Sequence, residues 1–308
     1  MASSALPARS LSWAGMGFAL STASLFSLVP YLTTVILNEG LAPLELLLIR
    51  YGLSGIIIVL ATCLDKPALL RISLRNLGLC LLCGVLYFAS TWAYTAAFTY
   101  IHTSIAAILV SIYPLLVFLL LALRGEKLTW RNSVRLALGL SGIYLVIGPG
   151  GSVNLMGVLL VFTSALSYAL YLVLMQWFLK AVPAKSITLY VTLTITFCLG
   201  VGWLLKGAPV SSMTMSIWLP MLFLVIGCTF LAQLFLFRAV NLMGSAQIAL
   251  LSPLETLLAL TWSALFLREN LSFLQMLGSS LILISMFLAV FRLKEVKRLW
   301  RTIARLRL

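Results

Sequence analysis

Hydrophobic residues dominate the chain in long segments, which short stretches of Gly, Pro and charged residues separate. Ten such segments cover residues 13–36, 43–63, 76–100, 104–123, 132–147, 155–179, 186–205, 216–239, 246–267 and 272–292. A helix needs about 20 mostly apolar residues to cross a bilayer, and most of these segments reach that length. The pattern therefore predicts an all-α polytopic membrane protein with ten transmembrane helices.

The chain also repeats itself. Leu81, Gly84, Ala89, Ala96, Ala106 and Glu126 recur 143 positions later as Leu224, Gly227, Ala232, Ala239, Ala249 and Glu269. Nearer the N-terminus, Ser24, Ser27, Tyr31 and Pro43 recur 140 positions later as Ser164, Ser167, Tyr171 and Pro183. Each copy holds five segments, an odd number, so the second copy is expected to enter the membrane in the opposite orientation. Inverted repeats are typical of secondary transporters that expose a site near the bilayer midplane to each side in turn.

The repeat divides the chain into four parts. We expect a cytoplasmic N-terminus over 1–12, a first five-helix repeat over 13–148, a second, inverted repeat over 155–292, and a basic amphipathic tail over 293–308. The tail fits either a helix lying on anionic lipid or a simple topology anchor.

Charge changes the interpretation in one respect. The sequence is 62% hydrophobic and 9% charged, yet its formal net charge is +14. Such a charge can indicate nucleic-acid binding. If the N-terminus is cytoplasmic, however, 18 of the 21 Lys and Arg residues fall on the cytoplasmic side, as the positive-inside rule describes. We therefore place both termini in the cytoplasm and expect no nucleic-acid partner.

Signatures of enzymes are absent from the sequence. No Gly-x-x-x-x-Gly-Lys-Ser/Thr loop for ATP occurs, and His102 is the only histidine, so a His-Glu-x-x-His zinc helix is excluded. Asp65, the only Asp, lies in a loop, which excludes an intramembrane aspartyl protease. We expect no enzymatic activity, no cofactor and no metal. The expected partners are a small-molecule substrate and membrane lipids, with the chain a monomer or a homodimer.

Polar residues inside the apolar segments are the candidates for a substrate path, because lipid cannot satisfy their hydrogen bonds. Two matching stripes carry Ser24, Ser27 and Tyr31 in the first segment and Ser164, Ser167 and Tyr171 in the sixth. Within each stripe the residues lie three and four apart and share a helix face. The stripes favour a lined cavity, with close helix packing as the alternative.

The third segment and its counterpart, the eighth, add aromatic and amide groups. Tyr87, Thr91 and Tyr94 are expected on one face, with Trp92 adjoining, and Gln233 aligns with Ser90 of the third segment. Such groups around one volume suit an amphipathic solute with a ring or a flat apolar body.

Glu255 is the sharpest candidate, because it follows Pro253 near the middle of the ninth segment. A charge at that depth costs at least about 2.5–3.5 kcal/mol, so the carboxyl needs a partner, a proton or a water-filled cavity. It could carry a coupling proton or bind a substrate ammonium. The structural alternative is a neutral Glu that bonds to a helix backbone.

Arg50 is a second charge of interest inside a segment, because it lies about 10 Å from the outer end of the segment over 43–63. We favour its extension toward the interface and Glu45 or Glu39. Otherwise it approaches Glu255 or a substrate carboxylate.

Two five-helix units that each close on a Glu-containing loop resemble the EamA branch of the drug/metabolite transporter superfamily. The residues that carry the resemblance are Gly125-Glu126-Lys127, Arg268-Glu269-Asn270, Tyr113-Pro114, Ser252-Pro253, Gly139, Gly142 and Gly278. It covers about residues 13–292, and it departs from the pattern at Arg268, where Gly is expected, and at Ser285, which replaces a second glycine. The resemblance implies a ten-helix inner-membrane carrier with a central cavity, usually an exporter of amino acids, metabolites or drugs.

We therefore expect a secondary membrane transporter in the cell inner membrane, an exporter of amino acids or related small amphipathic metabolites that works by alternating access. Glu255 and the aromatic faces match a cation on an apolar body. A drug or quaternary-amine efflux carrier is the closest alternative. From a different class, a lipid-linked flippase or a membrane enzyme stays open.

Overall fold

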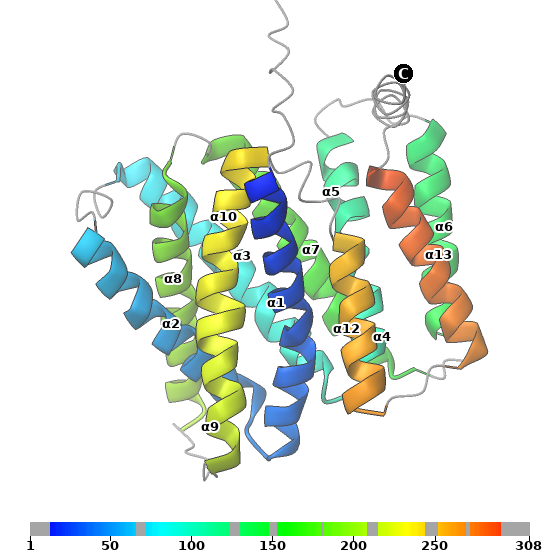
Figure 1. The fold of residues 1–308 in the computed structure, drawn as a ribbon, viewed down its shortest axis with the longest axis horizontal. Helices are drawn as coiled ribbons and strands as arrows, with labels where there is room; N and C mark the ends of the chain where they lie inside the picture. The colour runs from blue at the N-terminus through cyan, green and yellow to red at the C-terminus, as the bar shows by residue number, and fades with distance from the viewer. Residues whose placement is uncertain are drawn as a thin grey trace, which may run out of the picture.

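The structure is a computed structural model that describes residues 13–65, 72–122, 130–147, 153–179, 182–207, 215–243, 252–268 and 272–290. Every regular element in these ranges is a helix, and the helices lie side by side in a bundle (Figure 1). The first copy of the repeat forms α1 (Trp13–Asn38), α2 (Pro43–Asp65), α3 (Leu74–Ala97), α4 (Thr103–Val110), α5 (Tyr113–Ala122) and α6 (Trp130–Ile147). The second forms α7 (Leu155–Phe178), α8 (Ala184–Leu205), α9 (Met215–Leu222), η2 (Phe223–Leu231), α10 (Ala232–Met243), α12 (Ser252–Phe266) and α13 (Phe273–Val290).

The described helices lie within or close to the predicted apolar segments. Within the described ranges, six stretches are long and apolar enough to cross a membrane: most of α1 and α2, all of α3, Leu155–Met175 of α7, Lys185–Leu205 of α8, and the run Met215–Phe235. Four shorter apolar stretches in the same described residues cover Thr103–Val117, Ala137–Val146, Leu254–Phe266 and Phe273–Ser285. The prediction of an all-helical, multi-pass membrane protein is confirmed, whereas a full crossing by the shorter helices stays a prediction. The N-terminus to residue 12, the two loops at Glu126 and Glu269, and the tail from 293 lie outside the described residues.

The segment predicted over 104–123 is not one helix. It divides into α4 and α5 at Ser111 and Ile112, where Ile112 N donates to Leu109 O at 3.3 Å in a three-residue bond. The cause is Pro114, which has no N–H to donate to the carbonyl one turn earlier. The fourth predicted segment of the first copy is therefore broken near its middle, between α4 and α5.

The segment predicted over 216–239 departs from regular α-helix in a different way, because its centre, η2, is a π-helix. The Thr229 hydroxyl donates back to Leu224 O, five residues earlier, at 2.8 Å. π-Helical turns are rare in proteins, but those that occur are often found at functional sites.

The packing of the helices follows the repeat. α1 packs against α10, η2 and α12, while its counterpart α7 packs against α3, α4 and α5. α2 packs on its own counterpart α8, and α6 on its own counterpart α13. Each of these helices therefore has contacts that match those of its counterpart in the other copy. This is the pattern expected if a two-fold axis relates the two copies. Figure 1 shows α2 and α8 at one edge of the bundle and α6 and α13 at the opposite edge.

Two glycines set the distance between α6 and α13. A Cβ added at Gly142 would lie 2.7 Å from Gly278 O, and one added at Gly278 would lie 2.6 Å from Gly142 O. Both helix backbones approach closely at this crossing, as small residues allow in membranes. The resemblance had placed Gly142 and Gly278 in the helix after each Glu loop, and the structure shows the packing reason for them.

Candidate functional site

A cavity lies between the two copies of the repeat, and Glu255 contributes to its wall. The cavity has a volume of about 60 Å³. Its lining comes from α1, α3, α4, α5, α12 and the turn between α4 and α5, and consists of Phe26, Ser27, Pro30, Tyr94, Ala107, Val110, Ser111, Tyr113, Glu255, Thr256 and Ala259. Three of the predicted site residues, Ser27, Tyr94 and Glu255, therefore meet in one place.

Glu255 lies in the first turn of α12 as far as that helix is described, and its predicted place near the middle of the ninth segment stays a prediction. The described helix begins at Ser252, because residues 244–251 lie outside the described part of the chain. Among the described residues, neither a cation nor a backbone group is hydrogen-bonded to its carboxyl. The Tyr94 and Tyr168 hydroxyls lie within electrostatic range of it. The carboxyl thus borders a cavity beside hydroxyl groups, and the alternative of a Glu bonded to backbone has no support in this part of the chain.

Short hydrogen bonds fix the walls around Glu255. Ser111, at the break between α4 and α5, lies 2.8 Å from the Thr256 hydroxyl and also donates to Ala107 O at 2.7 Å. On the other side, the Trp262 indole N–H donates to the Ser27 hydroxyl at 3.0 Å and so ties α12 to α1. The helix that carries Glu255 is therefore held by one hydroxyl on the broken helix and one on α1. Discontinuous helices are a common way to build transporter sites.

A group of five tyrosines, which we call the tyrosine cluster, lies next to this cavity; its members are Tyr51, Tyr87, Tyr113, Tyr168 and Tyr171. Tyr87 and Tyr171 stack with ring centroids 5.0 Å apart and an interplanar angle of 8°. Tyr168 contacts both of these rings and packs edge-on against Tyr113 at 5.0 Å, and Tyr51 packs edge-on against Tyr87 at 6.4 Å. Because Tyr113 also lines the Glu255 cavity, the cluster extends from that cavity toward α2.

Sequence reasoning missed Tyr168 and Tyr113. Tyr168 lies four residues after Ser164 and three before Tyr171, so the face it shares with them was readable from the sequence. Tyr113 directly precedes Pro114, and its role becomes visible only where the helix breaks.

The remaining predicted site residues lie elsewhere. Tyr31 packs on Phe266 with ring centroids 5.2 Å apart, the Thr91 hydroxyl bonds to carbonyls of its own helix, and Ser167 is half-buried. Trp92 is 38% exposed. None of these four lines either cavity described here. Of the other stripe residues, Ser164 lies 3.2 Å from Ser90 and joins α7 to α3, and Ser24 is exposed.

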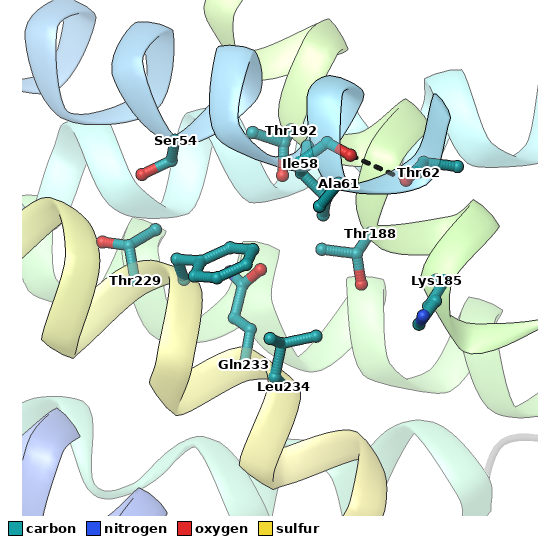
Figure 2. A pocket seen from close by; sticks show the side chains of 11 residues that line it. Ser54, Ile58, Ala61, Thr62, Lys185, Thr188, Thr192, Thr229, Gln233 and Leu234 are labelled. Atoms are coloured by element: carbon teal, nitrogen blue, oxygen red, sulfur yellow. Dashed lines mark hydrogen bonds between the residues drawn. The ribbon is translucent and has the colours of Figure 1, made fainter. Parts of the chain in front are cut away.

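A second cavity of about 90 Å³ lies among α2, α8, η2 and α10 (Figure 2). Its lining is rich in hydroxyl groups and consists of Ser54, Ile58, Ala61, Thr62, Lys185, Thr188, Thr192, Thr229, Phe230, Gln233 and Leu234. Gln233, predicted as a substrate contact, therefore lies in this cavity and not beside Glu255.

Arg50 does not extend outward, which corrects our favoured expectation. Its side chain is 7% exposed, and its Nε donates to the Thr229 hydroxyl at 2.8 Å. Its guanidinium carbon lies 5.2 Å from the centroid of the Tyr51 ring. Glu45, the expected partner, is instead within 3.4 Å of Ala42 N at the start of α2. The reason is the packing of η2 on α2, which offers a hydroxyl acceptor deep in the bundle.

Comparison with known proteins agrees with this architecture. The sequence profile of the EamA-like transporter family matches residues 13–148 and again 155–291. No curated protein matches the chain significantly. A crystal structure described only as that of a protein is similar over 89% of this chain and 96% of that chain, with a TM-score of 0.66 and 18% identity, which shows a shared fold. Since the family profile covers nearly the whole chain in two successive repeats, this protein is a membrane-embedded, multi-pass member of the EamA-like transporter family.

Proposed function

We propose that the protein is a secondary carrier that exports an amino acid or a related amine-bearing metabolite by alternating access, with Glu255 at its binding site. The observation that supports this most is the position of the Glu255 carboxyl. It borders a cavity between the two repeats and, within the described residues, has no cationic partner. An ammonium group of a substrate, or a proton, would supply the missing positive charge.

The walls of the cavity fit the rest of such a solute. Phe26, Val110 and Ala259 supply apolar surface, while Ser27, Ser111 and Thr256 supply hydroxyls. Tyr94 adds an aromatic face on which a cation attached to an apolar body can rest. A quaternary amine would use the same carboxylate and aromatic groups, and it is therefore the main competing substrate class.

Alternating access needs two arrangements of the helices around the cavity. The exchanged packing of the repeats supplies related contacts on both sides, and the break at Ser111 and Ile112 gives the first copy a flexible joint. In this proposal all ten predicted apolar segments cross the inner membrane, and the second copy is inverted. Both termini are then cytoplasmic, as the positive-inside distribution of Lys and Arg indicates.

The test is transport by the purified protein in vesicles, with a panel of amino acids, primary amines and quaternary amines. Glu255→Gln keeps the size of the side chain but cannot release a proton. If Glu255 carries the proton, this variant should lose accumulation driven by a pH gradient and keep exchange of substrate across the membrane. If Glu255 binds the ammonium, binding should weaken by about 1.5–3 kcal/mol, and exchange should fail as well.

Glu39→Gln is the matched control, because Glu39 is exposed at the end of α1 and accepts a hydrogen bond from Ser216 at 2.9 Å. It should transport like the unmodified protein. Full gradient-driven transport together with full exchange in Glu255→Gln would contradict both roles. Transport of quaternary amines but not amino acids would assign the site to the competing class.

A further inference from the structure

The second cavity has a chemistry opposite to that of the Glu255 cavity. Its lining holds a cation, Lys185, and, among the described residues, no carboxylate. The Ser54 and Thr229 hydroxyls donate to Val225 O at 3.5 Å and to Leu224 O at 2.8 Å, so the donors at their end of the cavity must come from Arg50, which lies behind them. Lys185 and Thr62 stand at one end, Thr229 and Ser54 stand at the other, and Thr188 and Thr192 lie between them (Figure 2). Gln233 faces the same space from α10. The cavity therefore presents hydroxyl, amide and cationic groups and suits an oxygen-bearing anion.

Arg50 lies directly behind the deep end of this cavity. It shares a face of α2 with Ser54, four residues later, and its Nε bonds to the Thr229 hydroxyl that lines the cavity. The Thr229 hydroxyl uses its own proton on Leu224 O, so toward Arg50 it acts only as an acceptor. Thr229 thus joins the guanidinium to the π-helix, accepting one hydrogen bond from Arg50 and donating another to Leu224 O.

The guanidinium is buried without a counter-charge. Its recorded contacts are a neutral hydroxyl and an aromatic ring, and no carboxylate among the described residues pairs with it. Burying an unpaired charge is costly, and such residues in membrane proteins usually serve an ion or a substrate. Arg presents five N–H donors in a planar fork, of which Nε–H is engaged here, and the fork matches a carboxylate.

We propose that the guanidinium of Arg50, through the donors that its bond to Thr229 leaves available, binds the carboxylate group of the solute at the Ser54 and Thr229 end of this cavity. The site is separate from the Glu255 cavity. It depends on the proposed function in one respect, because its ligand is taken to be the transported solute. One guanidinium balances one negative charge, so a monocarboxylate fits better than a doubly charged phosphate. Under the proposed topology Lys185 lies at the cytoplasmic end, so an anionic group would enter from the side from which an exporter loads.

The experiment uses probes that differ only in their charged groups. Affinities of 3-phenylpropionate, phenethylamine, L-phenylalanine and L-phenylalaninamide are measured by calorimetric titration on the full-length protein in lipid nanodiscs. Inorganic phosphate is titrated as the alternative anion. The unmodified protein should bind 3-phenylpropionate, and it should bind L-phenylalanine at least about tenfold more tightly than its amide, the low end for a charge-assisted hydrogen bond.

Arg50→Gln should reduce this tenfold preference to about one, and Arg50→Lys, which keeps the charge but loses the fork, should retain part of it. Arg238→Gln is the matched control, because Arg238 is exposed beside Phe18 and lines neither cavity. Glu255→Gln should leave the carboxylate preference intact. Melting temperatures of all variants separate loss of binding from loss of folding.

A folded Arg50→Gln variant with an unchanged carboxylate preference overturns the proposal, as does absence of that preference in the unmodified protein. Phosphate binding tighter than 3-phenylpropionate binding overturns the assignment to a carboxylate. Failure of the proposed function can be told apart from failure of the Arg50 site. If vesicles transport none of the four organic probes but Arg50→Gln abolishes carboxylate binding, the Arg50 site stands and the carrier role for these solutes falls. If the Arg50→Gln variant still transports carboxylate-bearing solutes as the unmodified protein does, the carrier role stands and the Arg50 site falls.

Discussion

The crossing of α6 and α13 allows a stability prediction with a magnitude taken from the structure. In Gly278→Ala, the new Cβ would lie 2.6 Å from Gly142 O and 2.9 Å from Val146 N. Both atoms belong to the main chain, so no side chain can move aside to relieve the overlap. The helices must separate by roughly 1 Å to restore ordinary contact distances of about 3.5 Å. Overpacking of this kind costs about 1–3 kcal/mol, and we expect the free energy of unfolding to fall by that amount.

Gly200→Ala is the matched control, because it makes the same change in α8 where a Cβ meets nothing within 4 Å. This variant should be neutral or more stable by up to about 1 kcal/mol, since Ala favours helix over Gly. Reversible unfolding in mixed detergent micelles, followed by circular dichroism, measures both changes. Equal stabilities of Gly278→Ala and Gly200→Ala would refute the close crossing and with it the role of the two glycines.

Topology, the aromatic residues and the α1–α12 contact each give a further expected outcome. A cysteine at position 126 should be labelled only from the cytoplasm and one at 269 only from outside, in a background without the five native cysteines; labelling of both from one side contradicts the inverted repeat. Tyr171→Ala, in the tyrosine cluster, should weaken the apparent affinity for transported substrate at normal expression, whereas Tyr31→Ala, at a ring that packs on Phe266 and lines neither cavity, should leave it unchanged. An unchanged affinity in Tyr171→Ala would assign its stripe to helix packing. Trp262→Phe removes the N–H that bonds to Ser27 and should lower the free energy of unfolding by about 0.5–1.5 kcal/mol. Trp218→Phe, at an exposed tryptophan, should stay within about 0.5 kcal/mol, and equal values for the two variants would show that the bond contributes nothing.

The segments and the repeat were predictable because they depend on periodic features of the sequence. Apolar length predicts a spanning helix wherever it occurs, and residues such as Ser27 and Ser167 reveal the repeat by simple offset. The meeting of Ser27, Tyr94 and Glu255 was not predictable in detail, because three helices from different parts of the chain must first be placed. The same limit explains why Gln233 was grouped with the wrong cavity.

Arg50 shows a second limit. Its distance from the helix end made extension to the interface reasonable, since a long side chain can reach water from that depth. What decided otherwise is the Thr229 hydroxyl, which the π-helix turns toward α2. A π-helical turn has no clear signature in an apolar sequence such as that of Phe223–Leu231, so the acceptor could not be foreseen.

The two charges on which the proposals rest, Glu255 and Arg50, are unequally shared between copies that are otherwise related. At the repeat offset of 143, Glu255 corresponds to Ile112, and at the offset of 140, Arg50 corresponds to Tyr190. If the protein alternates access as proposed, its inward-open and outward-open forms therefore differ in chemistry as well as in direction. A difference of about 1.4 kcal/mol between them already shifts their populations tenfold. The protein is thus expected to rest mainly on one side of the membrane, and exchanging Glu255 with Ile112 should move that resting preference toward the other side.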